Sequence, residues 1–170
     1  MLGAVLDGIM NLNDAGRMVD AAWLKIPARF PVMELDEHIV MPNHFHGIIR
    51  IVGVPLVGAQ KRAGVQKRAG APKGAGTRPA PTLGDAVGAF KSIATDDYIV
   101  GVKQLGWPSF NKHFWQRNYF EHVIRDQNEL EKIREYIRLN PLMWTVDRYN
   151  PELGVPVVDE SGRAVLWNET

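Results

Sequence analysis

Residues 32–52 read VMELDEHIVMPNHFHGIIRIV and predict the centre of the fold. The alternation of residue types over 32–40 is typical of a half-buried strand, with Met33, Leu35 and Ile39 on its apolar side. Residues 41–43 contain Pro and Asn, which favour a tight turn. Residues 44–52 are again rich in apolar residues and predict a second strand. We therefore expect the two strands to pair as an antiparallel hairpin.

The second strand carries two histidines at alternate positions. Because side chains alternate across a strand, His44 and His46 are expected on one face and Phe45 on the other. Two imidazoles side by side have the geometry of a pair of metal ligands. An ordinary hydrogen-bonded histidine pair is the alternative interpretation, and the pair by itself does not decide between them.

Helices and hairpins are predicted to alternate along the rest of the chain. Asp7-Gly8 between apolar residues favours a tight turn, and a Pro after an apolar stripe predicts a helix end at Pro27. The segment 101–112 is expected to be irregular. The alternation indicates an α+β sandwich with a mostly antiparallel sheet. Three further helices are predicted, with caps at Asn13 or Asp14, at Thr82 and at Asp126. A further strand is predicted over 113–124.

The last predicted helix carries Tyr136 and Asn140, four residues apart and therefore on one helical face. A phenol can act as a nucleophile, and an amide oxygen can bind a hard cation such as Mg²⁺ or Mn²⁺. Alternatively, Tyr136 packs its ring at the edge of the core and Asn140 caps the helix before Pro141. The spacing alone leaves both interpretations open.

Composition excludes several classes of protein. The 170 residues contain no Cys, so thiolate metal sites, a Cys nucleophile and disulfides are ruled out. The first residues carry no basic region followed by a long apolar run, and no stretch reaches the roughly 18 apolar residues of a spanning helix. We therefore expect a soluble, cytoplasmic protein with no membrane partner.

Charge is unevenly distributed. The chain has 20 basic and 19 acidic residues, but residues 53–82 contain six of the basic ones and no acid, which leaves 14 basic against 19 acidic residues elsewhere. This segment is rich in Gly, Ala and Pro and predicts a flexible loop over 53–81. It is either an arm for phosphate backbones or a solubilising hinge. Its repeated basic pairs are Lys61, Arg62, Lys67 and Arg68.

Three segments together resemble a known family. Residues 40–49 (VMPNHFHGII) resemble the HUH motif, two His around a hydrophobic residue, of the single-tyrosine insertion-sequence transposases. Residues 115–126 (WQRNYFEHVIRD) and 136–141 (YIRLNP) look like the REP-associated tyrosine transposase branch, and 82–92 (TLGDAVGAFKS) is similar to that family's middle helix. The joint occurrence is far more specific than any of the motifs alone.

The resemblance implies a ferredoxin-like domain that cleaves and rejoins single-stranded or hairpin DNA. His44, His46 and Asn140 would then bind a divalent metal, Mg²⁺ or Mn²⁺, and Tyr136 would attack phosphorus to leave a 5′-phosphotyrosine link. Such a protein would be associated with the nucleoid, either as a monomer or as a homodimer. Residues expected to contact DNA phosphates are Arg117, Lys91 and Arg138, together with the basic pairs of the loop.

The resemblance also divides the chain. It implies a catalytic domain over 1–150, interrupted by the loop, and a C-terminal tail over 151–170. Relatives carry a first strand ahead of the region that matches residues 1–8 (MLGAVLDG), so we expect the sheet either to lack that strand or to fill its place with residues 155–158. The alternative function is a truncated, inactive remnant that binds DNA hairpins, and a third is a metallohydrolase that uses water.

Overall fold

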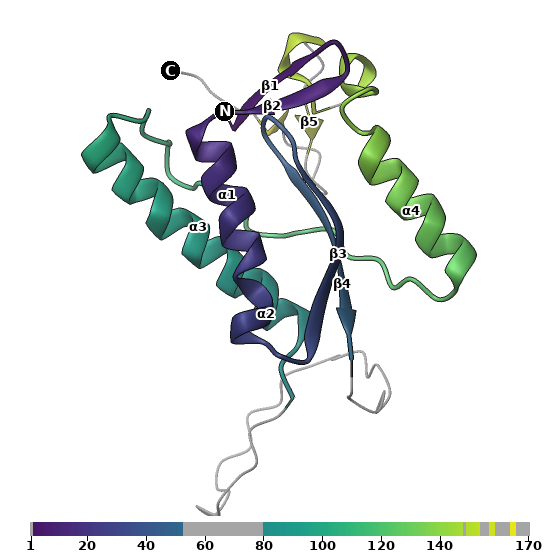
Figure 1. The fold of residues 1–170 in the computed structure, drawn as a ribbon. Helices are drawn as coiled ribbons and strands as arrows, with labels where there is room; N and C mark the ends of the chain where they lie inside the picture. The colour runs from purple at the N-terminus through teal and green to yellow at the C-terminus, as the bar shows by residue number, and fades with distance from the viewer. Residues whose placement is uncertain (1, 53–79, 148, 154–156, 159–163, 166–170) are drawn as a thin grey trace, which may run out of the picture.

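The β-hairpin predicted from residues 32–52 lies between a group of helices on one side and a single helix on the other (Figure 1). In this computed structural model, β3 (Met33–Val40) pairs antiparallel with β4 (Phe45–Ile51). The Met41 N–H donates to the His44 carbonyl at 2.8 Å and closes the turn. The structure describes residues 2–52, 80–147, 149–153, 157–158 and 164–165, so the basic residues predicted at 61, 62, 67 and 68 lie outside the described part.

The remaining elements make the protein a mixed α+β structure, as expected. The elements are β1 (Gly3–Leu6), β2 (Ile9–Leu12), α1 (Asp14–Leu24), α2 (Ile26–Arg29), α3 (Leu83–Leu105), α4 (Gln127–Leu139), two 3₁₀ turns at Trp144–Val146 and Pro151–Leu153, β5 (Val157–Val158) and β6 (Ala164–Val165).

None of the helices in the described ranges is long and apolar enough to cross a membrane.

Aromatic packing joins the hairpin to α1 and α3. Phe45 of β4 contacts Trp23 of α1 and Phe90 of α3, with ring centroids 4.8 and 4.9 Å apart. Trp23 is 3% exposed and Phe90 4%. Burial of these large aromatic surfaces contributes to the hydrophobic stabilisation of the core. The opposite face of β3 is covered by α4 (Figure 1).

A β-bulge interrupts the pairing of β3 with β4. Leu35 pairs with Ile49, but the next recorded pair is His38 with Gly47, so two residues, Asp36 and Glu37, lie opposite one. The prediction that Ile39 shares a face with Met33 and Leu35 is therefore wrong. Ile39 pairs with His46 and lies on the α4 side, because the extra residue inverts the alternation beyond the bulge.

Local signals predicted the helix starts correctly. Asn13 caps α1 by accepting from the Gly16 N–H at 2.9 Å, and Thr82 forms a reciprocal capping box with Asp85. Asp126 accepts from the Glu129 N–H at 2.9 Å at the start of α4. The Asp7-Gly8 turn of the β1–β2 hairpin is also confirmed, with positive φ at both residues.

Two helix ends differ from the prediction. Helix α1 ends at Leu24, and Pro27 lies in the first turn of α2, where a missing N–H costs nothing. Helix α3 continues through the segment 101–105, which was expected to be irregular. It ends at Gly106, whose φ of 70° is the left-handed conformation that terminates helices.

The strand predicted over 113–124 is wrong, because this segment is irregular. Phe114 packs on Tyr98 with centroids 4.4 Å apart, and Trp115 packs on Phe90 at 5.3 Å. The carbonyls of Gln116 and Asn118 accept from a lysine side chain instead of a neighbouring strand. The apolar residues are thus used for packing on α3.

The described strands form three separate two-stranded antiparallel sheets, not the single sheet that was expected. β1 pairs with β2, β3 with β4, and β5 with β6. Within the described residues, the segment 157–158 therefore pairs with 164–165 and does not extend the β3–β4 hairpin.

Candidate functional site

The two histidines of the hairpin face α4. The His44 and His46 ring centroids are 4.8 Å apart, with the ring planes at 81°. Phe45 points away from them into the aromatic layer. The alternation predicted for this strand is confirmed.

Helix α4 brings the predicted tyrosine and asparagine to the same place. The Tyr136 ring lies 5.4 Å from the His46 ring, edge to face. Tyr136 is 57% exposed, whereas Asn140, which caps the C-terminal end of α4 one turn later as the alternative interpretation expected, is 3% exposed. The helix therefore presents a phenol at the surface and an amide beneath it, both beside the imidazoles.

Three buried polar atoms in this cluster have no hydrogen-bond partner among the described residues. They are Nε2 of His44, Nε2 of His46 and Oδ1 of Asn140. Leaving one buried polar atom unpaired costs about 1–3 kcal/mol, and native proteins contain few such groups. Two imidazole nitrogens and an amide oxygen form a donor set that fits a divalent cation.

The imidazoles are held neutral. Burial lowers the pKa of His44 to about 4, with a further decrease from the neighbouring His46, while Asp147 and Asn140 act in the opposite direction. Burial also lowers the pKa of His46, against the opposing charge of Asp147. Neutral imidazole is the metal-binding form, so near pH 7 a cation would not compete with a proton.

Asn43 fixes the tautomer of His44. Its amide Nδ2 donates to the Tyr149 carbonyl at 2.6 Å, so its Oδ1 is the atom 2.9 Å from His44 Nδ1. A carbonyl oxygen can only accept, so Nδ1 carries the proton and Nε2 carries the lone pair. The unpartnered atom of His44 is therefore an acceptor aimed into the cluster.

The segment after α4 completes the wall of the cluster, which the sequence did not indicate. The rings of Trp144 and Tyr149 lie 6.0 and 5.2 Å from the His44 ring. Asp147 between them is close enough to influence the pKa of both histidines. No group of three or more His, Cys, Asp or Glu converges as a ligand set among the described residues, so the third candidate ligand is an amide.

Two arginines attach α4 to the bulge of β3. Arg134 donates from Nε and Nη2 to the two carboxylate oxygens of Asp36 at 2.7 and 2.6 Å. Arg138, predicted to contact DNA, donates from Nε to Glu37 at 2.8 Å. Bidentate arginine–carboxylate pairs fix geometry as well as adding energy. These pairs hold the helix that carries Tyr136 and Asn140.

Within the described ranges, the other residues predicted to contact DNA lie away from this cluster. Lys91 of α3 donates to the carbonyls of Gln116 and Asn118 at 2.7 and 3.3 Å, and burial lowers its pKa. Arg117 is exposed on the neighbouring loop. Lys91 and Arg117 thus share a surface, but the structure does not bring them to the histidines.

The fold and the cluster define a mixed α+β protein with a buried imidazole–amide group beside an exposed tyrosine. A Haemophilus influenzae protein described as uncharacterized is 36% identical over 155 residues, which cover 87% of this chain and 76% of that protein. The chain belongs to the same family as this Haemophilus protein. No family model matches the chain, and no solved structure matches it.

Proposed function

We propose that the protein is a metal-dependent transposase of the HUH single-tyrosine class, closest to the REP-associated branch, that cleaves and rejoins single-stranded or hairpin DNA. The observation that carries the proposal is the set of three unpartnered buried atoms of His44, His46 and Asn140 next to the exposed Tyr136. The sequence motifs that resemble this class name the same four residues.

His44, His46 and Asn140 would hold the cation, which is Mg²⁺ or Mn²⁺ in this proposal. When bound, it would polarise the scissile phosphate as a Lewis acid and orient it. The protein contributes neutral imidazoles, an Nε2 lone pair fixed by Asn43, and an amide held on a helix that two ion pairs anchor. This support keeps the donor atoms in position.

Tyr136 would be the nucleophile. Its oxygen would attack phosphorus and the bond from phosphorus to the 3′ oxygen would break; the phenol gives its proton to solvent and the 3′ oxygen takes one up from solvent, so it leaves as a 3′-OH with no net change in protons. The 5′-phosphate stays esterified to Tyr136. A second 3′-OH can reverse the step and join a new strand, because the phosphotyrosine retains the energy of the bond. The exposure of Tyr136 gives a DNA strand access to it.

We propose more specifically that this α+β domain is a ferredoxin-like sandwich. The β3–β4 hairpin, with α1 and α3 on one face and α4 on the other, is consistent with part of such a domain (Figure 1). The proposal extends to a nucleoid-associated protein in the cytoplasm. The same proposal covers either a monomer or a homodimer.

The decisive experiment incubates the protein with labelled single-stranded hairpin DNA and Mn²⁺ and detects covalent adducts in a denaturing gel. We expect an adduct with the wild type and none with Tyr136→Phe. Tyr119→Phe is the matched control, because Tyr119 is also an exposed tyrosine but lies outside the cluster. Binding without any adduct would support a non-catalytic hairpin-binding protein, and cleavage that survives Tyr136→Phe would support a metallohydrolase that uses water.

A further inference from the structure

A loop between α3 and α4 is fastened along one side of α3. At the C-terminal end of α3, the Trp107 ring lies directly on Gly101, where a Cβ would collide with the indole. The Tyr98 hydroxyl donates to the Pro108 carbonyl at 2.9 Å. The backbone of this segment is therefore held against the helix.

Lys91 fastens the other end of the same loop. Its ammonium group donates to the carbonyls of Gln116 and Asn118, and it lies 5.7 Å from the centre of the Tyr119 ring. Phe114 and Trp115 pack between these points on the α3 layer. The loop is thus tied at both ends, so the surface between loop and helix is preorganised.

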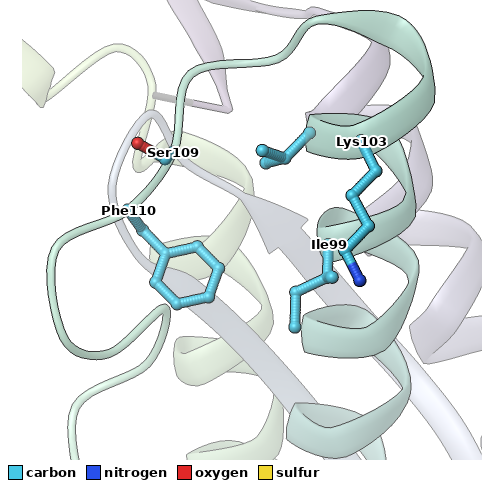
Figure 2. A pocket seen from close by; sticks show the side chains of 5 residues that line it. Ile99, Lys103, Ser109 and Phe110 are labelled. Atoms are coloured by element: carbon cyan, nitrogen blue, oxygen red, sulfur yellow. The ribbon is translucent and has the colours of Figure 1, made fainter.

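Two hollows lie in succession between the loop and α3. The first, of about 180 Å³, is shown in Figure 2, where the Phe110 ring and the Lys103 side chain line it from opposite sides. The second, of about 400 Å³, is lined by residues of α3 from 91 to 96 and of the loop from 110 to 117. Phe110 lines both hollows. Because they share Phe110, we call the two hollows together the α3 groove; between residues 91 and 103, which line them, α3 rises about 18 Å at 1.5 Å per residue.

The rim of the α3 groove carries unneutralised positive charge. Lys112 and Arg117 are exposed and make no ion pair with a carboxylate within the described ranges. By contrast, the arginines at 17, 50, 134 and 138 are each paired with an acid. Asp96 is the acidic side chain that lines the groove. The groove is therefore electropositive although the body of the chain is acidic.

The α3 groove lies on the other side of the hairpin from the histidines. Trp115 contacts Phe90, and Phe90 contacts Phe45, whose side chain points away from the two imidazoles that flank it. A ligand in the groove is thus separated from the cluster by the aromatic layer. Binding there can be measured independently of the chemistry at Tyr136.

We propose that the α3 groove binds the backbone of single-stranded DNA, with Lys112, Arg117 and Lys103 on the phosphates and Phe110 against a base. Proteins that bind single-stranded nucleic acid usually combine basic side chains along a groove with aromatic rings on which bases stack. A duplex would not use Phe110, because its bases are stacked inside. The choice of DNA rests on the proposed function, whereas the charge and shape of the groove do not.

The test is fluorescence anisotropy of a labelled 12-nucleotide oligothymidine, without metal, against the full chain. The double variant Lys112→Asn/Arg117→Gln removes both charges. Asn is chosen because Lys112 has a φ of 59°, a conformation that Asn tolerates. Arg29→Gln removes one charge from α2, outside the groove, and is the control. Lys103→Gln is a second single variant at the other end of the groove.

We expect the double variant to bind at least tenfold more weakly and its salt slope to decrease by about 1.4, since each phosphate contact on a single strand contributes about 0.7. Lys103→Gln should weaken binding less, and Arg29→Gln should bind within about twofold of the wild type. Equal binding by the double variant and the wild type, with the same melting temperature, would overturn the proposal. Displacement of the oligonucleotide by equimolar inorganic phosphate would also overturn it, because the groove would then be a general anion site.

The Tyr136→Phe variant separates this proposal from the proposed function. If Tyr136→Phe binds oligothymidine normally and the wild type forms no adduct with any DNA, the proposed transposase function is wrong and the proposed DNA binding in the α3 groove is supported. If the wild type forms the adduct but the double variant binds oligothymidine as the wild type does, the proposed transposase function is supported and the proposed DNA binding in the α3 groove is wrong.

Discussion

Asn43 Oδ1 lies 2.9 Å from His44 Nδ1, and the Asn43 Nδ2 donates to the Tyr149 carbonyl. This pair of contacts orients the amide and so directs the lone pair of His44 towards Asn140 and His46. A residue of the hairpin turn thereby decides which imidazole nitrogen is available to a cation. The residues around Asn43 in the sequence did not predict that Asn43 would orient His44.

Substitutions at Asn43 should therefore change metal affinity. Asn43→Ala removes the acceptor for Nδ1–H, and we expect the affinity for Mn²⁺ to decrease about 10- to 100-fold, as is usual for lost second-sphere partners. Asn43→Asp keeps an acceptor and should lose less. Isothermal titration calorimetry gives both affinities, and equal affinities for the wild type and Asn43→Ala would contradict the assignment.

The cluster itself should make stability depend on metal. At a Mn²⁺ concentration 100 times the dissociation constant, binding to the native state adds about 2.7 kcal/mol and raises the melting temperature. His46→Ala should abolish this rise, whereas His113→Ala, at an exposed histidine outside the cluster, should retain it. A calorimetric scan with and without Mn²⁺ measures the effect. An equal rise in His46→Ala would place the metal elsewhere.

The pair of Asp36 with Arg134 should make stability depend on pH. Hydrogen bonds from Arg134 lower the pKa of Asp36 from 3.8 to about 2. The folded state then holds its proton less tightly than the unfolded state, so the stabilisation is present above pH 3.8 and disappears as the pH falls towards 2. We expect Asp36→Asn to cost about 1–2 kcal/mol at pH 6 and almost nothing at pH 2.

Urea unfolding of the wild type and the variant at each pH gives that difference. The matched control is Asp14→Asn, because Asp14 pairs with Arg17 at 2.5 Å but is 72% exposed. An exposed pair contributes little, so this control should cost less than about 0.5 kcal/mol at either pH. A pH-independent cost for Asp36→Asn would mean that the charge of Asp36 is not what attaches α4.

Trp23 offers a test of the aromatic layer. Trp23 is 3% exposed, and its indole N–H has no partner among the described residues. Trp23→Ala leaves a cavity and should cost about 3–5 kcal/mol. Trp23→Phe keeps an aromatic ring and removes the unsatisfied donor, so we expect a cost of less than about 2 kcal/mol. Chemical denaturation measures both, and similar costs for the two variants would contradict the packing account.

Much of the local structure was predictable because its signals are local. The Asp7-Gly8 turn, the caps at Asn13, Thr82 and Asp126, and the opposite faces of Phe45 and its flanking histidines all follow from backbone preferences within a few residues. The same holds for the spacing of Tyr136 and Asn140 along one face of α4. These features need no information about the rest of the chain.

The sequence by itself therefore determined the helix starts and the two hairpins formed by β1–β2 and β3–β4, and it named the four side chains of the candidate site. The tertiary structure decided what those elements do together. It placed a bulge at Asp36 and Glu37, where two arginines about 100 residues later attach α4, and it used the apolar residues of 113–124 for packing on α3 instead of a strand. The reason is physical, because turns and caps depend on neighbouring residues, whereas packing depends on partners that are distant in sequence.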